Sequence, residues 1–299
     1  MHNNVTVLLS TFNGEKYLKE QLHSLYTQET VDLSILVRDD GSTDRTCAIL
    51  DEEQSAGRLS WYNGENKGPA LSFWELLYKA PESSYYSFCD QDDVWDKDKL
   101  ETAVKILSKS AGKPALYFCQ TRLVNSELKE IESVKISPLL TYEESLIYHF
   151  ITGCTIVINN ELRKELLKYT PDFMRMHDVW IYLVAQAVGA DIHFDSTPHI
   201  SYRQHGNNVI GQEHSIIGIW KGRIKRIRKN ECIRSRLAQE LLKGYSNILD
   251  TEKRELAIAV AHYKKSITSW IKLLFNRKLT CKPVAIRISS RIAILAKIF

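Results

Sequence analysis

The chain has 299 residues, of which 44% are hydrophobic, and this is enough to bury one sizeable core. Its net charge of +4 is unevenly spread, because residues 215–299 hold 20 Lys and Arg against 5 Asp and Glu, whereas residues 1–214 hold 20 against 31. No uncharged apolar run is long enough to predict a transmembrane helix, and the first residues resemble a strand more than a signal peptide. The six scattered cysteines lack zinc-site spacing and are typical of reduced thiols in a cytosolic protein.

Strands and helices alternate over the first 110 residues. Apolar, β-branched runs predict strands at Val5–Ser10, Leu33–Val37, Leu59–Asn63 and Tyr85–Cys89. Helical spacing of apolar residues predicts helices at Glu15–Tyr26, Thr46–Glu53, Pro69–Lys79 and Lys97–Lys109. This alternation indicates an α/β fold, with a mostly parallel central sheet flanked by helices on both faces.

The pattern loosens after residue 110. We expect a strand at Ala115–Cys119, an apolar segment at Leu146–Ile158, helices at Glu161–Tyr169 and Asp178–Val188, and strand character over His193–Ser201. A polar loop, Tyr202–Val209, follows. Everything beyond about Ile216 has the pattern of helices with basic faces.

Three carboxylates follow the predicted strand Tyr85–Cys89, namely Asp90, Asp92 and Asp93. Anions this close repel one another unless a cation or several hydrogen-bond donors hold them. Their oxygen atoms suit Mg²⁺ or Mn²⁺, and these ions in turn suit a diphosphate. The alternative is a strand-to-helix turn in which one Asp caps the helix that starts near Asp96.

A second acidic motif, Arg38–Asp44, closes the predicted strand Leu33–Val37. A carboxylate fixed at a strand end can accept a hydrogen bond from a pyrimidine ring N–H or from a ribose hydroxyl. The alternative is an Asx turn before a helix capped by Ser42 or Thr43. We favour ligand binding for Asp39 and Asp40, and the local turn for the rest of the motif.

The motifs Thr-Phe-Asn-Gly, Asp-Asp-Gly-Ser-Thr-Asp and Asp-Gln-Asp-Asp, each placed after a strand, resemble the family 2 nucleotide-sugar glycosyltransferases of the Rossmann-like GT-A fold. The resemblance covers roughly residues 4–210. The charge count and helical pattern of the tail predict a basic amphipathic helical extension over 215–299. The resemblance implies a GT-A domain over 1–214, with a nucleotide-sugar half at 1–110 and an acceptor half at 111–214. The nucleotide-sugar-binding residues that it implies are Thr11, Asn13, Asp39, Asp40, Asn66, Lys67, Asp90 and Arg203. It also implies that Asp92 binds Mn²⁺ or Mg²⁺. The family's Ala-Arg-Asn is replaced by Leu71-Ser72-Phe73.

The segment His177-Asp178-Val-Trp180 resembles the family motif whose Asp is the general base. A sugar hydroxyl is a poor nucleophile, and a carboxylate within hydrogen-bond reach can take its proton during attack. The resemblance also places Gly153, Cys154 and Trp180 in the acceptor pocket. The alternatives for Asp178 are a helix cap and an ion pair with Arg175.

The phrase Tyr202-Arg-Gln-His-Gly-Asn-Asn-Val209 resembles a bacterial subgroup that transfers rhamnose in surface polysaccharide assembly. It implies that His205 is a metal ligand and that Arg203 neutralises the leaving group; the alternative for His205 is an ordinary surface or core histidine. The expected enzyme is an inverting transferase that uses dTDP-L-rhamnose. The alternatives are a UDP-sugar-dependent glucosyl-, galactosyl- or galactofuranosyltransferase and a non-catalytic membrane-associated scaffold.

The basic end of the chain carries apolar stripes. Ile217, Trp220, Ile224 and Ile227 share one helical face, and Val284, Ile288, Ile292 and Leu295 share another, while Trp270–Phe275 is strongly apolar. Amphipathic basic helices favour an anionic membrane surface, which would place the protein peripherally at the cytoplasmic face, near a lipid-linked oligosaccharide acceptor. The alternative is a helical bundle packed on the catalytic domain, notably at Leu237–Leu249. Nucleic acid is not expected as a partner, because no base-reading module accompanies the charge.

Overall fold

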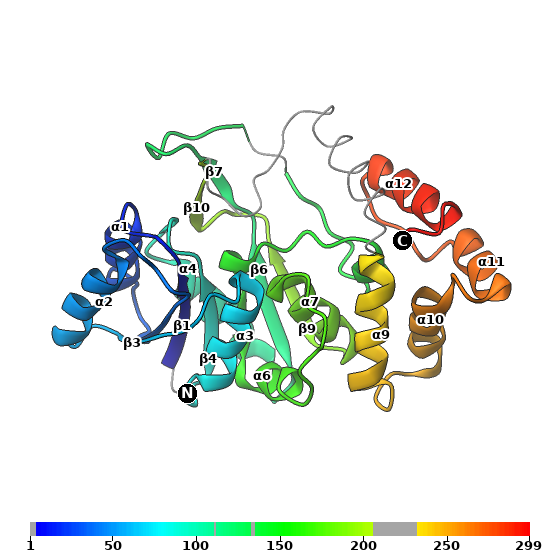
Figure 1. The fold of residues 1–299 in the computed structure, drawn as a ribbon, viewed down its shortest axis with the longest axis horizontal. Coiled ribbons are helices and arrows are strands. Elements are labelled where there is room, and N and C mark those ends of the chain that lie inside the picture. The colour runs from blue at the N-terminus through cyan, green and yellow to red at the C-terminus, as the bar shows by residue number, and fades with distance from the viewer. Residues whose placement is uncertain (1–3, 111, 133–134, 206–231) are drawn as a thin grey trace.

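The structure is a computed structural model that describes residues 4–110, 112–132, 135–205 and 232–299. A seven-stranded sheet at its centre has the strand order β3-β2-β1-β4-β8-β6-β9 (Figure 1). Its strands are β1 (Asn4–Thr11), β2 (Asp32–Asp39), β3 (Ser60–Asn63), β4 (Tyr85–Cys89), β6 (Ala115–Cys119), β8 (Val157–Asn159) and β9 (Asp191–Asp195). Only β8 is antiparallel to its neighbours β4 and β6, so the predicted mostly parallel sheet is confirmed.

Helices cover both faces of this sheet. In the N-terminal part of the chain these helices are α1 (Leu18–Tyr26), α2 (Thr46–Ser55), α3 (Pro69–Lys79) and α4 (Lys99–Leu107). In the second half they are α5 (Tyr142–Ile147), α6 (Asn160–Leu166) and α7 (His177–Ala187). The bounds of α3, β4 and β6 are those predicted. The helix α1 begins three residues later than expected, because the backbone N–H groups of Tyr17 and Leu18 both bond to the carbonyl of Gly14 in a turn.

A small second sheet crosses the carboxyl side of the main one. It consists of β5 (Val94–Trp95), β10 (Ile200–Arg203) and β7 (Arg122–Val124), in the order β5-β10-β7. The predicted single strand over His193–Ser201 is therefore two strands, β9 and β10, in different sheets. Because β10 pairs with β5, which follows the acidic turn directly, residues about 110 positions apart come together there.

The hydrophobic core lies in two layers, one on each face of the main sheet. Alternate residues of β1 enter opposite layers, as the two-residue period of a strand requires: Leu8 packs toward α3 and α7, while Val7 and Leu9 pack toward α1 and α4. Such two-sided burial explains why the strands are nearly continuous apolar runs in the sequence.

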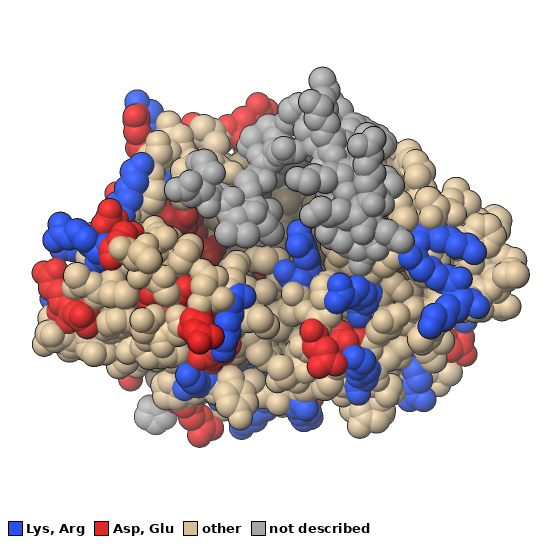
Figure 2. Space-filling view, in the orientation of Figure 1, with Lys and Arg blue, Asp and Glu red and all other residues tan. Residues whose placement is uncertain are grey.

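The layer that contains Leu8 continues into four C-terminal helices, α9 (Ile233–Tyr245), α10 (Thr251–His262), α11 (Ile267–Phe275) and α12 (Val284–Leu295). Leu237, Leu241, Tyr245 and Leu249 are buried in it, so the alternative of a bundle packed on the catalytic domain is confirmed for this segment. Lys and Arg side chains gather over these helices in Figure 2. The predicted basic helix at Ile217–Lys229 and the predicted boundary at residue 214 lie outside the described residues. Among the described helices, none is both long and apolar enough to span a bilayer.

Candidate functional site

The carboxyl ends of β1, β2 and β4 meet at one edge of the sheet, and polar side chains follow each of them. Thr11 and Asp39 are partners in the register of β1 and β2, and the N–H of Asp40 donates to the carbonyl of Thr11 at 2.8 Å. Ligands of parallel α/β sheets bind at this edge. The sequence motifs therefore converge in space as expected.

The carboxylate of Asp39 holds the turn that follows β2. It accepts hydrogen bonds from the Thr11 hydroxyl at 2.8 Å, from the Ser42 hydroxyl at 2.6 Å and from the Ser42 N–H at 2.7 Å, and it is completely buried. The side-chain oxygen of Asn13 accepts from the N–H of Thr43 at 2.8 Å. Thr11, Asn13 and Asp39 thus join the two turns to each other. A direct contact of these side chains with a nucleoside stays a prediction.

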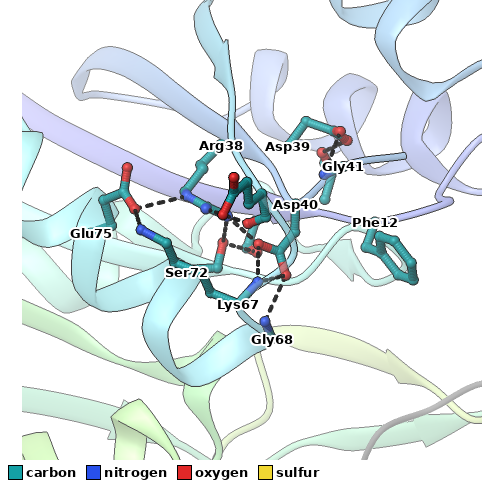
Figure 3. Close-up of polar contacts among 12 residues, drawn as sticks. Phe12, Arg38, Asp39, Asp40, Gly41, Lys67, Gly68, Ser72 and Glu75 are labelled. Atoms are coloured by element: carbon teal, nitrogen blue, oxygen red, sulfur yellow. Dashed lines mark hydrogen bonds and ion pairs between the residues drawn. The ribbon is translucent and has the colours of Figure 1, made fainter. Parts of the chain in front are cut away.

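Asp40 belongs to a different network, drawn in Figure 3. It is paired with the guanidinium of Arg38 and accepts from the N–H groups of Lys67, at 3.0 Å, and Gly68, at 2.8 Å. Arg38 is completely buried and also donates to the carbonyl of Glu65 at 2.9 Å. Asp40 therefore anchors the segment that contains Asn66 and Lys67, both exposed at the surface.

Arg38 is the centre of this network, and no role was predicted for it. Its Nε lies 3.3 Å from Glu75, which also receives a hydrogen bond from Lys67 at 3.0 Å. Burial opposes ionisation of Glu75, but hydrogen bonds from Lys79 and Lys67 outweigh it and lower the pKa of Glu75 to about 2. An arginine at the end of an otherwise apolar strand was the available signal. Gly64 makes room for it, because a Cβ there would lie 2.4 Å from the Arg38 Nη2.

The acidic turn after β4 brings Asp90 and Asp93 together with Cys154. Their ligand atoms all lie within 4.8 Å of one another. Burial, and then the charge of Asp92, raise the pKa of Asp90 to about 7, and the same two causes raise the pKa of Asp93 well above its usual value. Asp93 is completely buried, and its Oδ2 has no hydrogen-bond partner among the described residues. Two carboxyl groups with raised pKa values, one of them with an unsatisfied oxygen, therefore lie side by side in the acidic turn.

The two predicted metal ligands lie side by side. The Nε2 of His205 is 2.7 Å from the Oδ2 of Asp92, and the imidazole stacks on the ring of Tyr17 with centroids 5.1 Å apart. The register of β5 and β10 brings these distant segments together. Tyr17 was not predicted for this site, because its position in the turn before α1 is known only from the fold.

Arg203 ties this region together. Its backbone N–H donates to Asp93 at 3.0 Å, and its guanidinium donates to the carbonyl oxygens of Asp92 and Ser126, at 2.7 Å each, and to Glu20. All three guanidinium nitrogens therefore bond to protein groups in this structure. This arrangement positions the acidic turn, and the predicted contact of Arg203 with the donor stays a prediction.

Two further residues of this region were not anticipated. The side-chain amide of Gln91 accepts from the N–H of Phe12 at 2.8 Å and donates to its carbonyl at 3.0 Å, so it locks the acidic turn to the turn after β1. Lys99 is completely buried with its Nζ 3.4 Å from the Ser87 hydroxyl, and burial lowers its pKa to about 8. When protonated, Lys99 is a buried cation that attracts the carboxylate of Asp93 electrostatically.

The predicted general base, Asp178, lies in the first turn of α7. The cap position is Met176, and no ion pair with Arg175 is present among the described residues, so neither alternative for Asp178 is found. Burial raises the pKa of Asp178 to about 6, against the opposing effect of hydrogen bonds from the N–H groups of Val179 and Gly153. The charge of Asp178 in turn raises the pKa of Asp90, which shows that the two carboxylates are within electrostatic reach.

His177, which precedes the predicted base Asp178, lies among aromatic rings. Its imidazole centroid is 4.1 Å from Phe73 and 5.2 Å from Phe88, and burial lowers its pKa to about 3, which keeps it neutral. A Cβ on Gly153 would lie 2.6 Å from the Nε2 of His177. Gly153 is thus needed for the close approach of its turn to the start of α7.

The predicted acceptor contacts of Trp180 and Cys154 need correction. Trp180 is completely buried and packs between Tyr169 and Tyr245, with centroids 6.4 and 6.2 Å away, so it joins α7 to α9 and offers no surface to an acceptor. The Cys154 thiol is buried beside Asp90 and Asp93, below the surface of the site. Trp180 is two residues after Asp178, so the helical period places the two side chains on nearly opposite faces of α7, and the face of Trp180 is packed against α9.

The chain is similar to known glycosyltransferases in sequence and in fold. A family model described as "Glycosyl transferase family 2" matches residues 6–168. The dTDP-rhamnosyl transferase RfbG of Shigella flexneri is 30% identical over 237 residues, which are 73% of this chain and 78% of that protein. The Staphylococcus aureus TarS fragment 1-349 in complex with UDP-GlcNAc superposes with a TM-score of 0.63 at 20% identity, over 93% of this chain and 77% of that one.

A second solved structure, the mannosyltransferase PcManGT from Pyrobaculum calidifontis in complex with GDP-Man and Mn²⁺, superposes with a TM-score of 0.52 at 17% identity. It covers 99% of this chain and 88% of that one. At these identities the two structures show the fold alone, which is GT-A, whereas the family model and RfbG show the family. The chain is a glycosyltransferase and belongs to glycosyltransferase family 2.

Proposed function

We propose that this enzyme transfers a sugar from a nucleotide diphosphate donor, bound at the carboxyl ends of β1, β2 and β4, to a hydroxyl of a saccharide acceptor, with inversion at the anomeric carbon. The observation that carries the proposal is the pairing of Asp92 with His205 at 2.7 Å, on the same edge of the sheet as the buried base Asp178. The acidic turn would bind the diphosphate of the donor through a divalent cation. Asp178 would remove the proton of the acceptor hydroxyl.

The residues around the acidic turn fit a divalent cation. Asp92 and His205 would hold Mn²⁺ or Mg²⁺ directly, and Asp90 lies beside them with a carboxylate that resists ionisation. Carboxylate oxygens suit both Mn²⁺ and Mg²⁺, and PcManGT was solved in complex with GDP-Man and Mn²⁺. When bound, such a cation would neutralise the negative charge of the diphosphate leaving group.

Asp178 supplies the base. Its pKa of about 6 leaves it ionised at neutral pH while keeping it more basic than an ordinary carboxylate. It would take the proton of the acceptor hydroxyl as the oxygen attacks the anomeric carbon, opposite the bond to the leaving phosphate oxygen. The non-catalytic scaffold is less well supported, because a scaffold needs neither this base nor the paired Asp92 and His205.

The donor is proposed to be dTDP-L-rhamnose. The support is RfbG, a dTDP-rhamnosyl transferase that is similar to this chain over 73% of its length. A UDP-sugar is the second candidate, because TarS binds UDP-GlcNAc. The acceptor is proposed to be a lipid-linked oligosaccharide of a bacterial surface polysaccharide.

A donor panel tests the proposal. The purified 299-residue enzyme is incubated with dTDP-L-rhamnose and with UDP-glucose, UDP-galactose and UDP-galactofuranose, with and without Mn²⁺, and the released nucleotide is measured by chromatography. We expect dTDP release with Mn²⁺, and a 10²–10⁴-fold lower rate in Asp178→Asn, the usual range for loss of a general base. Release of UDP but not of dTDP would show that the donor is a UDP-sugar and not dTDP-L-rhamnose. A wild-type rate in Asp178→Asn would remove Asp178 from the chemistry.

A further inference from the structure

The helix α11 exposes a stripe of large apolar side chains. Ile267 is 74% exposed, Ile271 is 46% exposed and Phe275 is 74% exposed. These positions are four residues apart, so they lie along one face of the helix. The opposite side holds Leu273, which is completely buried in the core. The helix α11 therefore has apolar residues on its solvent-exposed face as well as on the face that packs against the core.

The helix α12 has the same feature. Val284, Ile288, Ile292 and Leu295 are between 45% and 55% exposed and follow helical spacing, whereas Ile294 is completely buried. Single exposed apolar residues are common on proteins, but contiguous exposed stripes mark an interaction surface.

The two helices are fixed to each other. The indole N–H of Trp270 donates to the carbonyl of Ile294 at 2.9 Å. The guanidinium of Arg291 donates to the carbonyl oxygens of Leu274, at 2.9 Å, and Leu279, at 3.0 Å. Both stripes thus belong to one folded unit, which we call the α11–α12 surface and define by its exposed apolar residues: Ile267, Ile271, Phe275, Val284, Ile288, Ile292 and Leu295.

The charge around this surface has one sign. Residues 256–299 contain 9 Lys and Arg and no Asp or Glu. Some of these cations pair with acidic residues of α10, as Lys272 does with Glu255 at 2.6 Å, but Lys265, Arg277 and Arg287 make no ion pair among the described residues. Figure 2 shows Lys and Arg bordering uncharged surface at this end of the molecule. Two copies of such a surface would repel each other, whereas an anionic bilayer would attract it.

We propose that the α11–α12 surface docks the enzyme on a bilayer that contains anionic lipids. Exposed Ile, Val, Leu and Phe side chains would enter the boundary between headgroups and acyl chains, and the surrounding cations would contact the headgroups. In Figure 1, α12 lies on the side of the molecule toward which β1 runs, which is the side of the candidate site. The proposal rests on the proposed function only in that a lipid-linked acceptor gives such docking a purpose.

Vesicle flotation of the 299-residue protein tests the proposal. The probes are vesicles of phosphatidylcholine alone and of phosphatidylcholine mixed with phosphatidylglycerol. We expect binding to the mixed vesicles that salt weakens but does not abolish, because the apolar part of the contact is not screened. The stripe variant Ile271→Ser, Phe275→Ser, Ile288→Ser should bind at least about tenfold more weakly. Its matched control, Tyr78→Ser with Ile248→Ser, changes exposed apolar residues elsewhere and should bind like the wild type.

Charge reversal gives a second arm. Lys265→Glu, Arg277→Glu, Arg287→Glu should lower binding to the mixed vesicles at least about a hundredfold, since each basic residue near an anionic surface contributes roughly fivefold. Lys105→Glu, Lys109→Glu, Lys164→Glu makes the same change in net charge on α4, the turn after it and α6, and should have a small effect.

Three results would overturn the proposal. Wild-type vesicle binding by the stripe variant would mean that other residues contact the membrane. Equal losses in the two charge variants would mean that net charge alone drives binding. Concentration-dependent self-association in sedimentation, abolished by the serine substitutions while vesicle binding persists, would assign the surface to a second copy. Donor hydrolysis without vesicles is measured in parallel, so a failed donor assignment remains distinguishable from failed docking.

Discussion

At the scale of single residues, the site combines groups that resist ionisation with groups that hold them in place. Burial raises the pKa of Asp90 to about 7 and of Asp178 to about 6. Arg203 and Gln91 hold the acidic turn that carries Asp90, whereas Asp178 lies on α7. A carboxyl group whose pKa is raised by burial lowers the stability of the fold when it is ionised. Such groups are found mainly at functional sites.

The first prediction concerns Asp92, the carboxylate paired with His205. Asp92→Asn should abolish the part of dTDP or UDP binding that depends on Mn²⁺, because a neutral amide oxygen is a much weaker ligand than a carboxylate. Isothermal calorimetry with and without Mn²⁺ measures this. Asp51→Asn, an exposed aspartate on α2, is the control. If Asp92→Asn binds the nucleotide with wild-type affinity in the presence of Mn²⁺, Asp92 is not a metal ligand.

The second prediction is a pH profile for Asp178. A general base must be deprotonated, so kcat/KM should fall about tenfold per pH unit below a pKa of about 6, and stay level above it until another group titrates. The rate measured from pH 5 to 8 at saturating Mn²⁺ checks this. A flat profile across pH 6 would exclude Asp178 as the titrating base.

The same carboxylate makes a third prediction, on stability. Its pKa is raised from 3.8 to about 6 on folding, so the folded protein binds that proton more tightly than the unfolded chain, and stability is lost as pH rises from about 4 to 6. Asp178→Asn cannot ionise. Its free energy of unfolding should therefore exceed the wild-type value by an amount that grows with pH to about 3 kcal/mol above pH 7. Urea unfolding at pH 5 and pH 8 measures the difference; an excess that shrinks with pH would contradict it.

At the scale of elements, the end of β2, the segment 64–68 and α3 are joined through one buried cation. Arg38 contacts Asp40, Glu65, Ser72 and Glu75, so three separate segments depend on it. A buried ion pair adds little net stability over an apolar substitute, yet removal of one partner leaves an uncompensated charge.

The fourth prediction follows. Arg38→Met should lower the free energy of unfolding by about 3–5 kcal/mol, because Asp40 and Glu75 lose their buried counter-ion. Adding Asp40→Asn should recover part of the loss, since one of the two uncompensated charges is gone. Arg45→Met, at an exposed position, should stay within about 0.5 kcal/mol of the wild type. If the double variant is as unstable as the sum of the single ones, the pair is not coupled as the structure indicates.

At the scale of the whole molecule, the C-terminal helices share a core layer with the catalytic sheet. Trp180 of α7 packs against Tyr245 of α9, and Tyr142 of α5 donates to the carbonyl of Lys253 in α10 at 3.3 Å. The helices from Ile233 onward are therefore part of the folded catalytic unit, while α11 and α12 keep an outer face exposed.

The fifth prediction tests this unity. Leu241 is completely buried in α9, and Leu241→Ala should cost about 2–5 kcal/mol. Because the core layer is shared, calorimetry should still show one unfolding transition, and nucleotide binding should be lost in that same transition. Ile248→Ala, at a 45% exposed position, is the control. A separate early transition with nucleotide binding intact would show that the C-terminal helices unfold independently.

The sequence alone was sufficient to predict the central sheet and the acidic motifs. Each strand is buried on both faces and is therefore a distinct apolar run in the sequence. Because β1, β2 and β4 are parallel neighbours, the residues that follow them, including Thr11, Asp39 and Asp92, lie at the same edge of the sheet. The sequence could not determine the roles of Arg38, Gln91 and Lys99, because a buried polar residue gives the same signal as an exposed one until its partners are known. Only the tertiary structure showed that Trp180 points into the core and that α11 and α12 leave apolar faces outside. Helical spacing defines a face, but which face is buried depends on what packs against it.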